Sequence, residues 1–179
     1  VEEEEIGSGC RTVRRKSMAK SSVENVLTVL RRTMSVDPRD YDIHVNFPGG
    51  VPTDGPSAGV AVAVAVYSAI EGLAVDNKVA MTGEISIRGL VKPVGGVVAK
   101  VEAARQAGAT KILIPAENYQ ELFKDLPGVQ VIPLDRLEEA IRISLVSPTT
   151  VEKSNELPAR SPLDLLSASG FRQGHNLSK

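Results

Sequence analysis

Apolar residues recur with two different periods along the chain, and these periods predict both helices and strands. Between residues 21 and 34 the spacing is helical, and Ser21 with Glu24 forms a candidate capping box at its start. Residues 41–47 alternate apolar and polar side chains, which predicts a strand. The apolar stripe of the predicted helix consists of Val23, Val26, Leu27, Leu30 and Met34.

The run from Ser57 to Gly72 is strongly apolar, and its pattern is ambiguous. Strict Val/Ala alternation over residues 60–66 is a strand signal. However, about 16 residues is long for a strand, and a Gly-Pro-Ser segment with a terminal glycine suits the two ends of a helix. We therefore predict a buried helix that ends at Gly72.

The second half of the chain alternates predicted strands and helices, which indicates a layered fold of the α/β (α+β) class. The predicted elements are a ribbon of two strands over 79–83 and 85–91, a helix over 97–107 ended by Gly108, a strand over 111–115, a short helix over 117–123, a strand over 129–132 and a final helix capped by Asp135 and Glu138. The acidic opening through Val13 is predicted as an edge strand or hairpin arm. Because composition changes to Ser, Pro, Asn and Lys at residue 147, we predict one domain over 1–146 and a C-terminal tail over 147–179.

Composition and charge narrow the class of protein. The chain has 179 residues, enough for one buried core, and 21 Lys and Arg against 22 Asp and Glu give a net charge of −1. No nucleic-acid partner is expected, because phosphate contacts need a concentrated basic face. Cys10 is the single cysteine, which excludes an internal disulfide and fits a reducing compartment. With no signal-peptide pattern and no apolar run of roughly 20 residues, this piece is expected to be soluble.

Ser57 is the first candidate for chemistry. It follows a Gly-Pro turn and opens the predicted buried helix, where unpaired backbone N–H groups and the helix dipole would stabilise an oxyanion. The same position suits a simple helix cap, and the loop alone favours that interpretation. A serine nucleophile also needs a base that takes its proton.

The sequence offers few bases for such a serine. His44 lies in a predicted strand and His175 in the tail, which disfavours a Ser-His-Asp triad, although His44 keeps it open. A lysine can act instead if burial lowers its pKa. Lys100 stands out because it follows a Gly-Gly pair on an otherwise apolar helical turn. The other downstream candidates are Lys78, Lys92 and Lys111.

Three segments, in this order, resemble the proteolytic domain of the Lon protease family: residues 54–59 (DGPSAG), 82–84 (TGE) and 95–100 (GGVVAK). A fourth, residues 111–118 (KILIPAEN), follows, and the resemblance covers roughly residues 17–145. Each motif is weak alone, but three at these spacings are specific. One departure is His44-x-Asn46, which stands where many relatives carry His-x-His, so no supporting role is carried over to the second position.

The resemblance implies a serine endopeptidase that works through a Ser-Lys dyad, with Ser57 as nucleophile and Lys100 as general base. It also implies that Thr82 hydrogen-bonds the lysine amine and that Asp54 lies beside the site. The loop residues implied around the oxyanion are Gly55, Pro56 and Ala58.

For the whole protein, the resemblance implies a fold related to the second domain of ribosomal protein S5 and a homohexameric ring in the cytoplasm. An AAA+ ATPase module of the same parent chain would feed in unfolded or regulatory proteins. No cofactor or metal is expected in this domain. The resemblance implies that ATP and Mg bind to the ATPase module. This sequence contains no G-x-x-x-x-G-K-[ST] loop, so the chain itself is not expected to hydrolyse ATP. The sequence does not exclude a membrane anchor elsewhere on the parent protein.

Two other functions remain open at this point. One is a non-catalytic Lon-like scaffold or oligomerisation module, in which Ser57 and Lys100 would have no chemical role. The other is a small-molecule kinase or phosphate-binding domain of S5-like topology, because a Gly-rich loop that opens a helix also binds phosphate.

Overall fold

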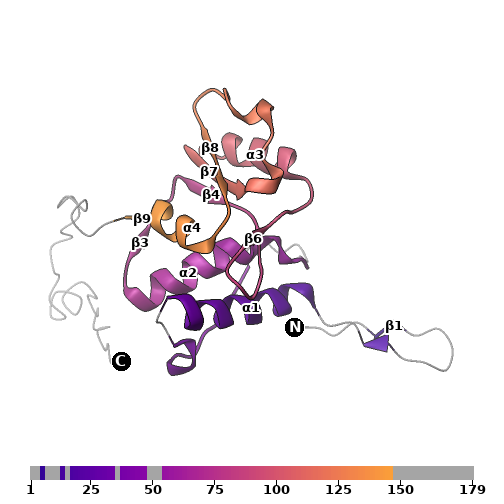
Figure 1. Cartoon of the computed structure of the whole chain (residues 1–179), viewed down its shortest axis with the longest axis vertical. Coiled ribbons are helices and arrows are strands. Elements are labelled where there is room, and N and C mark those ends of the chain that lie inside the picture. The colour runs from indigo at the N-terminus through magenta and orange to yellow at the C-terminus, as the bar shows by residue number, and fades with distance from the viewer. Residues whose placement is uncertain (1–4, 7–12, 15–16, 35–36, 48–53, 147–179) are drawn as a thin grey trace, which may run out of the picture. The chain divides into compact units, whose positions relative to one another are not determined.

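The computed structural model of the chain describes residues 5–6, 13–14, 17–34, 37–47 and 54–146, so the predicted tail over 147–179 lies outside the described residues. Short 3-10 turns (η) accompany the helices and strands (Figure 1). The elements in chain order are β1 Glu5–Ile6, β2 Val13–Arg14, α1 Met18–Thr33, η1 Pro38–Asp40, η2 Pro56–Ala58, α2 Gly59–Glu71, β3 Ala74–Val75, β4 Val79–Met81, β5 Glu84–Ile85, β6 Val91–Lys92, α3 Val97–Gln106, β7 Lys111–Pro115, η3 Ala116–Asn118, η4 Glu121–Phe123, β8 Gln130–Leu134, α4 Leu137–Ser144 and β9 Leu145–Val146.

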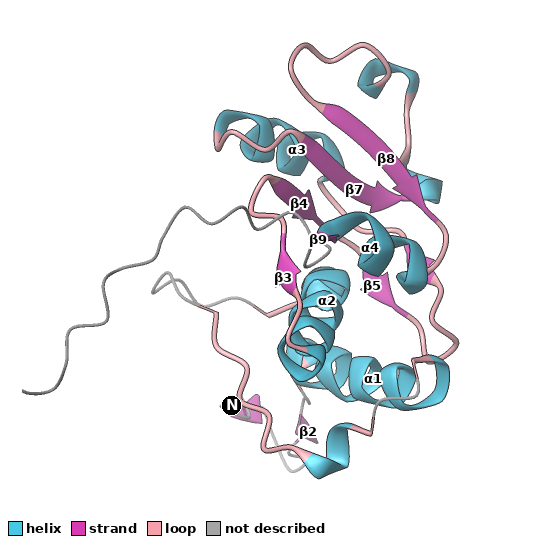
Figure 2. Cartoon of the chain, turned by 90° about the vertical axis from the view of Figure 1, so that its left-hand side faces the viewer, coloured by secondary structure: helices cyan, strands magenta, loops and turns pink. Residues whose placement is uncertain are grey.

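A three-stranded parallel sheet with the order β4-β7-β8 organises the second half of the domain. Its central strand β7 is covered on both faces, as is usual for a parallel sheet. Ile112 and Ile114 face a cluster that includes α3, whereas Leu113 faces the main core with α2 and α4. Figure 2 shows these layers, with α3 on one side of the sheet and α2 and α4 on the other. The mixed α+β class predicted from the sequence is therefore confirmed.

Helix α2 is the apolar helix predicted from the Val/Ala run. Its C-cap is Gly72, with φ of 66° in the left-handed region that glycine adopts without strain. Six of its 13 residues are buried, and its partner α1 contributes Val26, Val29 and Leu30 to the same core. Because α2 is buried on several faces, its apolar residues do not form the single stripe of a surface helix. This is why their spacing resembles that of a strand.

The predicted capping box of α1 is wrong. The N-cap is Ser17, whose hydroxyl accepts from the Lys20 N–H at 3.2 Å, so the helix begins about a turn before Ser21. The Ser21 hydroxyl instead donates to the Ser17 carbonyl at 3.2 Å. The last helix is also capped differently, because the Glu139 carboxylate, not a box of Asp135 with Glu138, accepts from the N–H groups ahead of α4.

Three other predicted elements are corrected. The antiparallel ribbon is formed by β5 and β6, while β4 belongs to the parallel sheet. Residues 117–123 form parts of two 3-10 turns, not one helix, because Tyr119 and Gln120 between them are extended. Residues 42–47 contain no assigned strand, since no other described segment pairs with them.

The remaining predictions agree with the structure. The opening arm is an antiparallel pair of β1 and β2, and the helix before Gly108, the strand over 111–115 and the strand around 130 are present. Strand β3 pairs with β9, which joins the end of α2 to the end of α4. Within the described ranges, no helix has the length and apolar character needed to cross a bilayer.

Candidate active site

Ser57 lies in the 3-10 turn η2, directly before α2, and its main chain is held by the connection between β4 and β5. The Ser57 carbonyl accepts hydrogen bonds from the Gly83 N–H at 2.9 Å and from the Thr82 hydroxyl at 3.1 Å. The Val60 N–H donates back to the Gly83 carbonyl at 3.1 Å. Three hydrogen bonds thus fix the start of α2 against residues 82–83.

Glycines permit this close approach. A Cβ on Gly83 would lie 2.8 Å from side-chain carbons of both Val60 and Val91, and a Cβ on Gly59 would lie 3.1 Å from the Ile85 amide nitrogen. Non-bonded carbons normally stay about 3.5–4.0 Å apart. Gly59 of the DGPSAG segment and Gly83 of the TGE segment are therefore required by packing at the point where the two segments meet.

Asp54 anchors the loop before Ser57 to the N-terminus of α1. One of its carboxylate oxygens accepts from the Ser17 hydroxyl at 2.9 Å and from the Ala19 N–H at 2.8 Å. A carboxylate at this end of a helix also interacts favourably with the helix dipole. Ser22 adds a longer contact, donating from its hydroxyl to the Pro56 carbonyl at 3.4 Å. The structure thus places Asp54 in the loop that leads to Ser57.

Lys100 lies on the first turn of α3 and is half-buried. The N-cap of this helix is Gly96, with φ of 68°, and the Lys100 N–H donates to the Gly96 carbonyl at 3.1 Å. The left-handed backbone at Gly96 explains the Gly-Gly segment, because side chains are strained there.

Ser57, Thr82 and Lys100 line one cavity of about 330 Å³. The rest of its wall is apolar and comes from α2, β4, α3 and β7: Ala58, Ala61, Ala80, Met81, Val101, Ala103, Ala104, Ile112 and Ile114. Two residues 43 positions apart in the sequence, Ser57 and Lys100, therefore line the same cavity. The described structure records no direct hydrogen bond between Ser57 Oγ and Lys100 Nζ, nor between Thr82 and the lysine amine.

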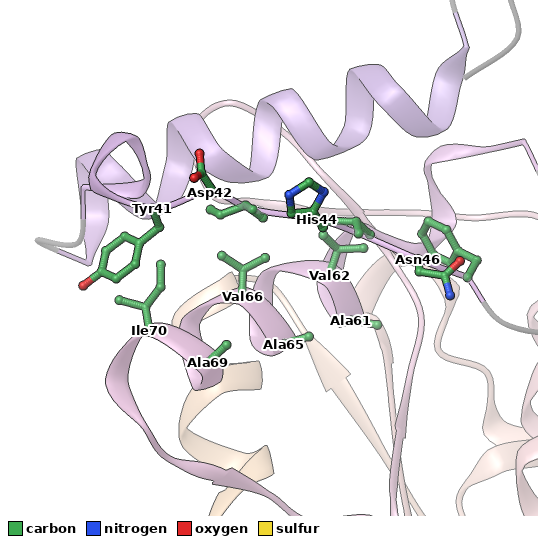
Figure 3. A pocket seen from close by; sticks show the side chains of 13 residues that line it. Tyr41, Asp42, His44, Asn46, Ala61, Val62, Ala65, Val66, Ala69 and Ile70 are labelled. Atoms are coloured by element: carbon green, nitrogen blue, oxygen red, sulfur yellow. The ribbon is translucent and has the colours of Figure 1, made fainter.

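The other candidate bases lie elsewhere. Lys92 pairs with Glu117 at 3.2 Å, Lys78 is exposed, and neither they nor Lys111 line the Ser57 cavity. His44 is exposed on the extended segment 41–47, beside a separate groove of about 490 Å³ over α2. Figure 3 shows His44 next to the α2 side chains of that groove, which does not include Ser57. The geometry thus favours lysine over His44, while His175 lies outside the described residues.

The helix-cap interpretation of Ser57 finds no support, and two of the amides that a phosphate would use are already occupied. Ser57 is not the N-cap of α2; Ala58 is, without a side-chain hydrogen bond. A phosphate site at a helix N-terminus needs free N–H groups. Here the Gly59 N–H donates to the Pro56 carbonyl and the Val60 N–H to the Gly83 carbonyl. Among the described residues, His, Cys, Asp and Glu form no group of three or more that could hold a metal.

Sequence reasoning missed two polar contacts near the site. One is the Ser17–Asp54 contact, whose signal was a serine directly before the helical pattern. The other is Asn118, which lies in the KILIPAEN segment and hydrogen-bonds the Val94 backbone ahead of α3. The sequence pattern identifies the KILIPAEN segment. It does not predict the contact of Asn118 with the loop before α3, because that contact joins residues 24 positions apart.

Sequence comparison places this α+β domain in a known class of peptidase domains. The family model of the Lon protease (S16) C-terminal proteolytic domain matches residues 11–147. The chain is 57% identical over 153 residues to Lon protease 2 of Bacillus subtilis, covering 86% of this chain and 28% of that protein. It is 44% identical over 142 residues to the Archaeal Lon protease of Thermoplasma acidophilum, covering 76% of this chain and 21% of that protein.

The chain therefore belongs to the Lon protease family, and the matched region is the proteolytic domain of that family. It spans only about a quarter of the length of these relatives. The resemblance seen in residues 54–59, 82–84 and 95–100 is thus confirmed at the level of the family.

Proposed function

We propose that this domain is the endopeptidase part of an ATP-dependent protease, with Ser57 as nucleophile and Lys100 as general base. The observation that carries the proposal is the shared cavity, because Ser57 of η2 and Lys100 of α3 both line it although they are far apart in the sequence.

The reaction would proceed in two halves. Ser57 Oγ attacks the peptide carbonyl carbon while Lys100 Nζ takes the hydroxyl proton, which gives a tetrahedral intermediate. Lys100 then donates that proton to the leaving amine as the C–N bond breaks, leaving an ester on Ser57. A water molecule, deprotonated by Lys100, hydrolyses the ester and restores the serine.

The oxyanion of the intermediate would be stabilised by backbone N–H groups at the start of α2. Two amides there are already used, because Gly59 donates to Pro56 and Val60 donates to Gly83. Donors are therefore expected from the segment formed by Gly55, Pro56, Ser57 and Ala58, in which proline has no N–H to offer. The Gly59 and Val60 amides could bind the oxyanion only if substrate binding broke their present hydrogen bonds.

The remaining roles concern the whole protein. We infer that an AAA+ ATPase module of the same parent chain, which binds ATP and Mg, delivers unfolded polypeptide to this domain. Homohexamers in the cytoplasm would enclose the Ser57 sites in a ring, and residues 1–146 would form the catalytic domain ahead of a tail over 147–179. Thr82 would orient the lysine amine through its hydroxyl lone pairs, and Asp54 would order the loop before Ser57.

The test compares Ser57→Ala and Lys100→Ala with wild type in the full-length protein, using an unfolded protein substrate with ATP. We expect both variants to fold and to lose cleavage. Lys78→Ala is the matched control, because Lys78 is exposed and lies outside the cavity, and it should cleave normally. Cleavage at the wild-type rate by either site variant would refute the dyad, and a fully folded wild type without any cleavage would favour the scaffold alternative.

A further inference from the structure

Asn118 makes a two-point contact with the backbone of the loop ahead of α3. Its side-chain oxygen accepts from the Val94 N–H at 2.8 Å, and its side-chain nitrogen donates to the Val94 carbonyl at 3.2 Å. The side chain therefore satisfies both polar groups of one residue, as a neighbouring strand would. Such a contact fixes the position and the direction of the Val94 peptide groups.

The residues after Val94 depend on this contact for their position. A Cβ on Gly95 or Gly96 would meet nothing within 4 Å, so neither glycine is held by packing. Glycine also has the widest backbone freedom of any residue, which makes the pair a natural hinge. The turn from Val94 into α3 is thus anchored before the hinge by Asn118 and after it by the buried Val97.

The same contact ties α3 to the wall of the Ser57 cavity. Asn118 ends η3, which follows β7 directly, and Ile112 and Ile114 of β7 line the cavity with Lys100. The helix that carries Lys100 begins three residues after the Val94 peptide groups that Asn118 holds. Loss of the Asn118 contact would therefore leave the buried Val97 as the side-chain anchor at the start of α3, three residues before Lys100.

We propose that Asn118 is a positioning residue for Lys100, an inference that rests on the proposed role of Lys100 as general base. Asn118 touches neither Ser57 nor the lysine amine; it sets the distance between them by fixing the start of α3. Misplacement of a catalytic group by about 1 Å can cost on the order of 100-fold in rate. Loss of this contact is accordingly expected to lower turnover and leave substrate binding intact.

The test measures kcat and KM for peptide cleavage in the full-length protein carrying Asn118→Ala. We expect kcat to fall by about 10-fold or more, with KM changed by less than about twofold, because the interaction lost acts on the chemical step. Backbone hydrogen exchange at residues 97–101 should accelerate in the same variant. Asn118→Asp keeps the acceptor for the Val94 N–H and loses the donor, so its kcat should lie between those of wild type and Asn118→Ala.

Glu117→Gln is the matched control, because it removes the exposed ion pair with Lys92 from the same turn and leaves the Val94 contact in place. It should keep kcat within about twofold of wild type. The inference is overturned if Asn118→Ala, or Asn118→Asp should the alanine variant not fold, keeps the wild-type kcat. It is also overturned if Glu117→Gln loses as much activity. Lys100→Ala distinguishes failure of this inference from failure of the proposed function, because full cleavage by that variant would refute the proposed function itself.

Discussion

The hydroxyl of Thr82 donates a hydrogen bond to the carbonyl oxygen of Ser57, with 3.1 Å between the two oxygens. Thr82 is buried, and its neighbour Gly83 donates to the same carbonyl from its N–H. The TGE segment therefore holds the main chain of the candidate nucleophile. This arrangement links two family motifs through backbone geometry rather than through contact between their side chains.

Replacing Thr82 by valine tests that link. Valine has the shape of threonine without the hydroxyl, so Thr82→Val should destabilise the fold by about 1 kcal/mol through loss of one buried hydrogen bond. The rate of cleavage should fall by more than the loss of stability accounts for, because the hydroxyl also holds the main chain of Ser57. Thr82→Ser keeps the hydroxyl and serves as control in the same urea-unfolding and cleavage assays. Equal activity of the valine and serine variants would remove Thr82 from the site.

The close packing at Gly83 predicts a stability defect. An added methyl group would lie 2.8 Å from side chains of Val60 and Val91, so Gly83→Ala must displace buried residues and should cost about 1–3 kcal/mol. Urea unfolding followed by circular dichroism measures this cost. Gly95→Ala is the control, because open space surrounds that position, and its effect should be several-fold smaller. Equal stability of the two variants would contradict the packing described at Gly83.

Asp54 links the loop before Ser57 to the start of α1. Asp54→Ala removes the acceptor for the Ser17 hydroxyl and the Ala19 N–H, and we expect a loss of about 1 kcal/mol in the free energy of unfolding. Slower cleavage should accompany this loss, because the loop loses its anchor. Asp54→Asn keeps a carbonyl oxygen at the same place, so it should retain most of the stability. If the alanine and asparagine variants behave alike, the hydrogen bonds of Asp54 Oδ1 do not hold this loop.

Local signals in the sequence were enough for the elements whose ends depend on nearby residues. Gly72 ends α2 through its own backbone freedom, and the β-branched, apolar run of residues 111–115 forms the buried strand β7 at the predicted positions. The pairing of Ser57 with Lys100 came from the spacing of family motifs. The chemistry of the residues alone leaves several lysines as candidate bases for Ser57.

Elements that depend on distant contacts could not be predicted. Residues 42–47 have the alternation of a strand, but a strand also requires a paired neighbour, which no other described segment supplies. The start of α1 is stabilised by Asp54, 35 residues beyond Ala19, so the local Ser21–Glu24 pattern was misleading. Asn118 ends a 3-10 turn and hydrogen-bonds Val94, where a continuous helix was predicted.

The most direct measurement is covalent labelling of the full-length protein with a fluorophosphonate, followed by mass spectrometry of the modified peptide. We expect an adduct on Ser57 in wild type and a strong decrease in its rate of formation in Lys100→Ala, because the serine has lost its base. Labelling of Lys78→Ala should proceed at the wild-type rate. An adduct on a different residue, or undiminished labelling of Ser57 in Lys100→Ala, would contradict the claim that these two residues act together.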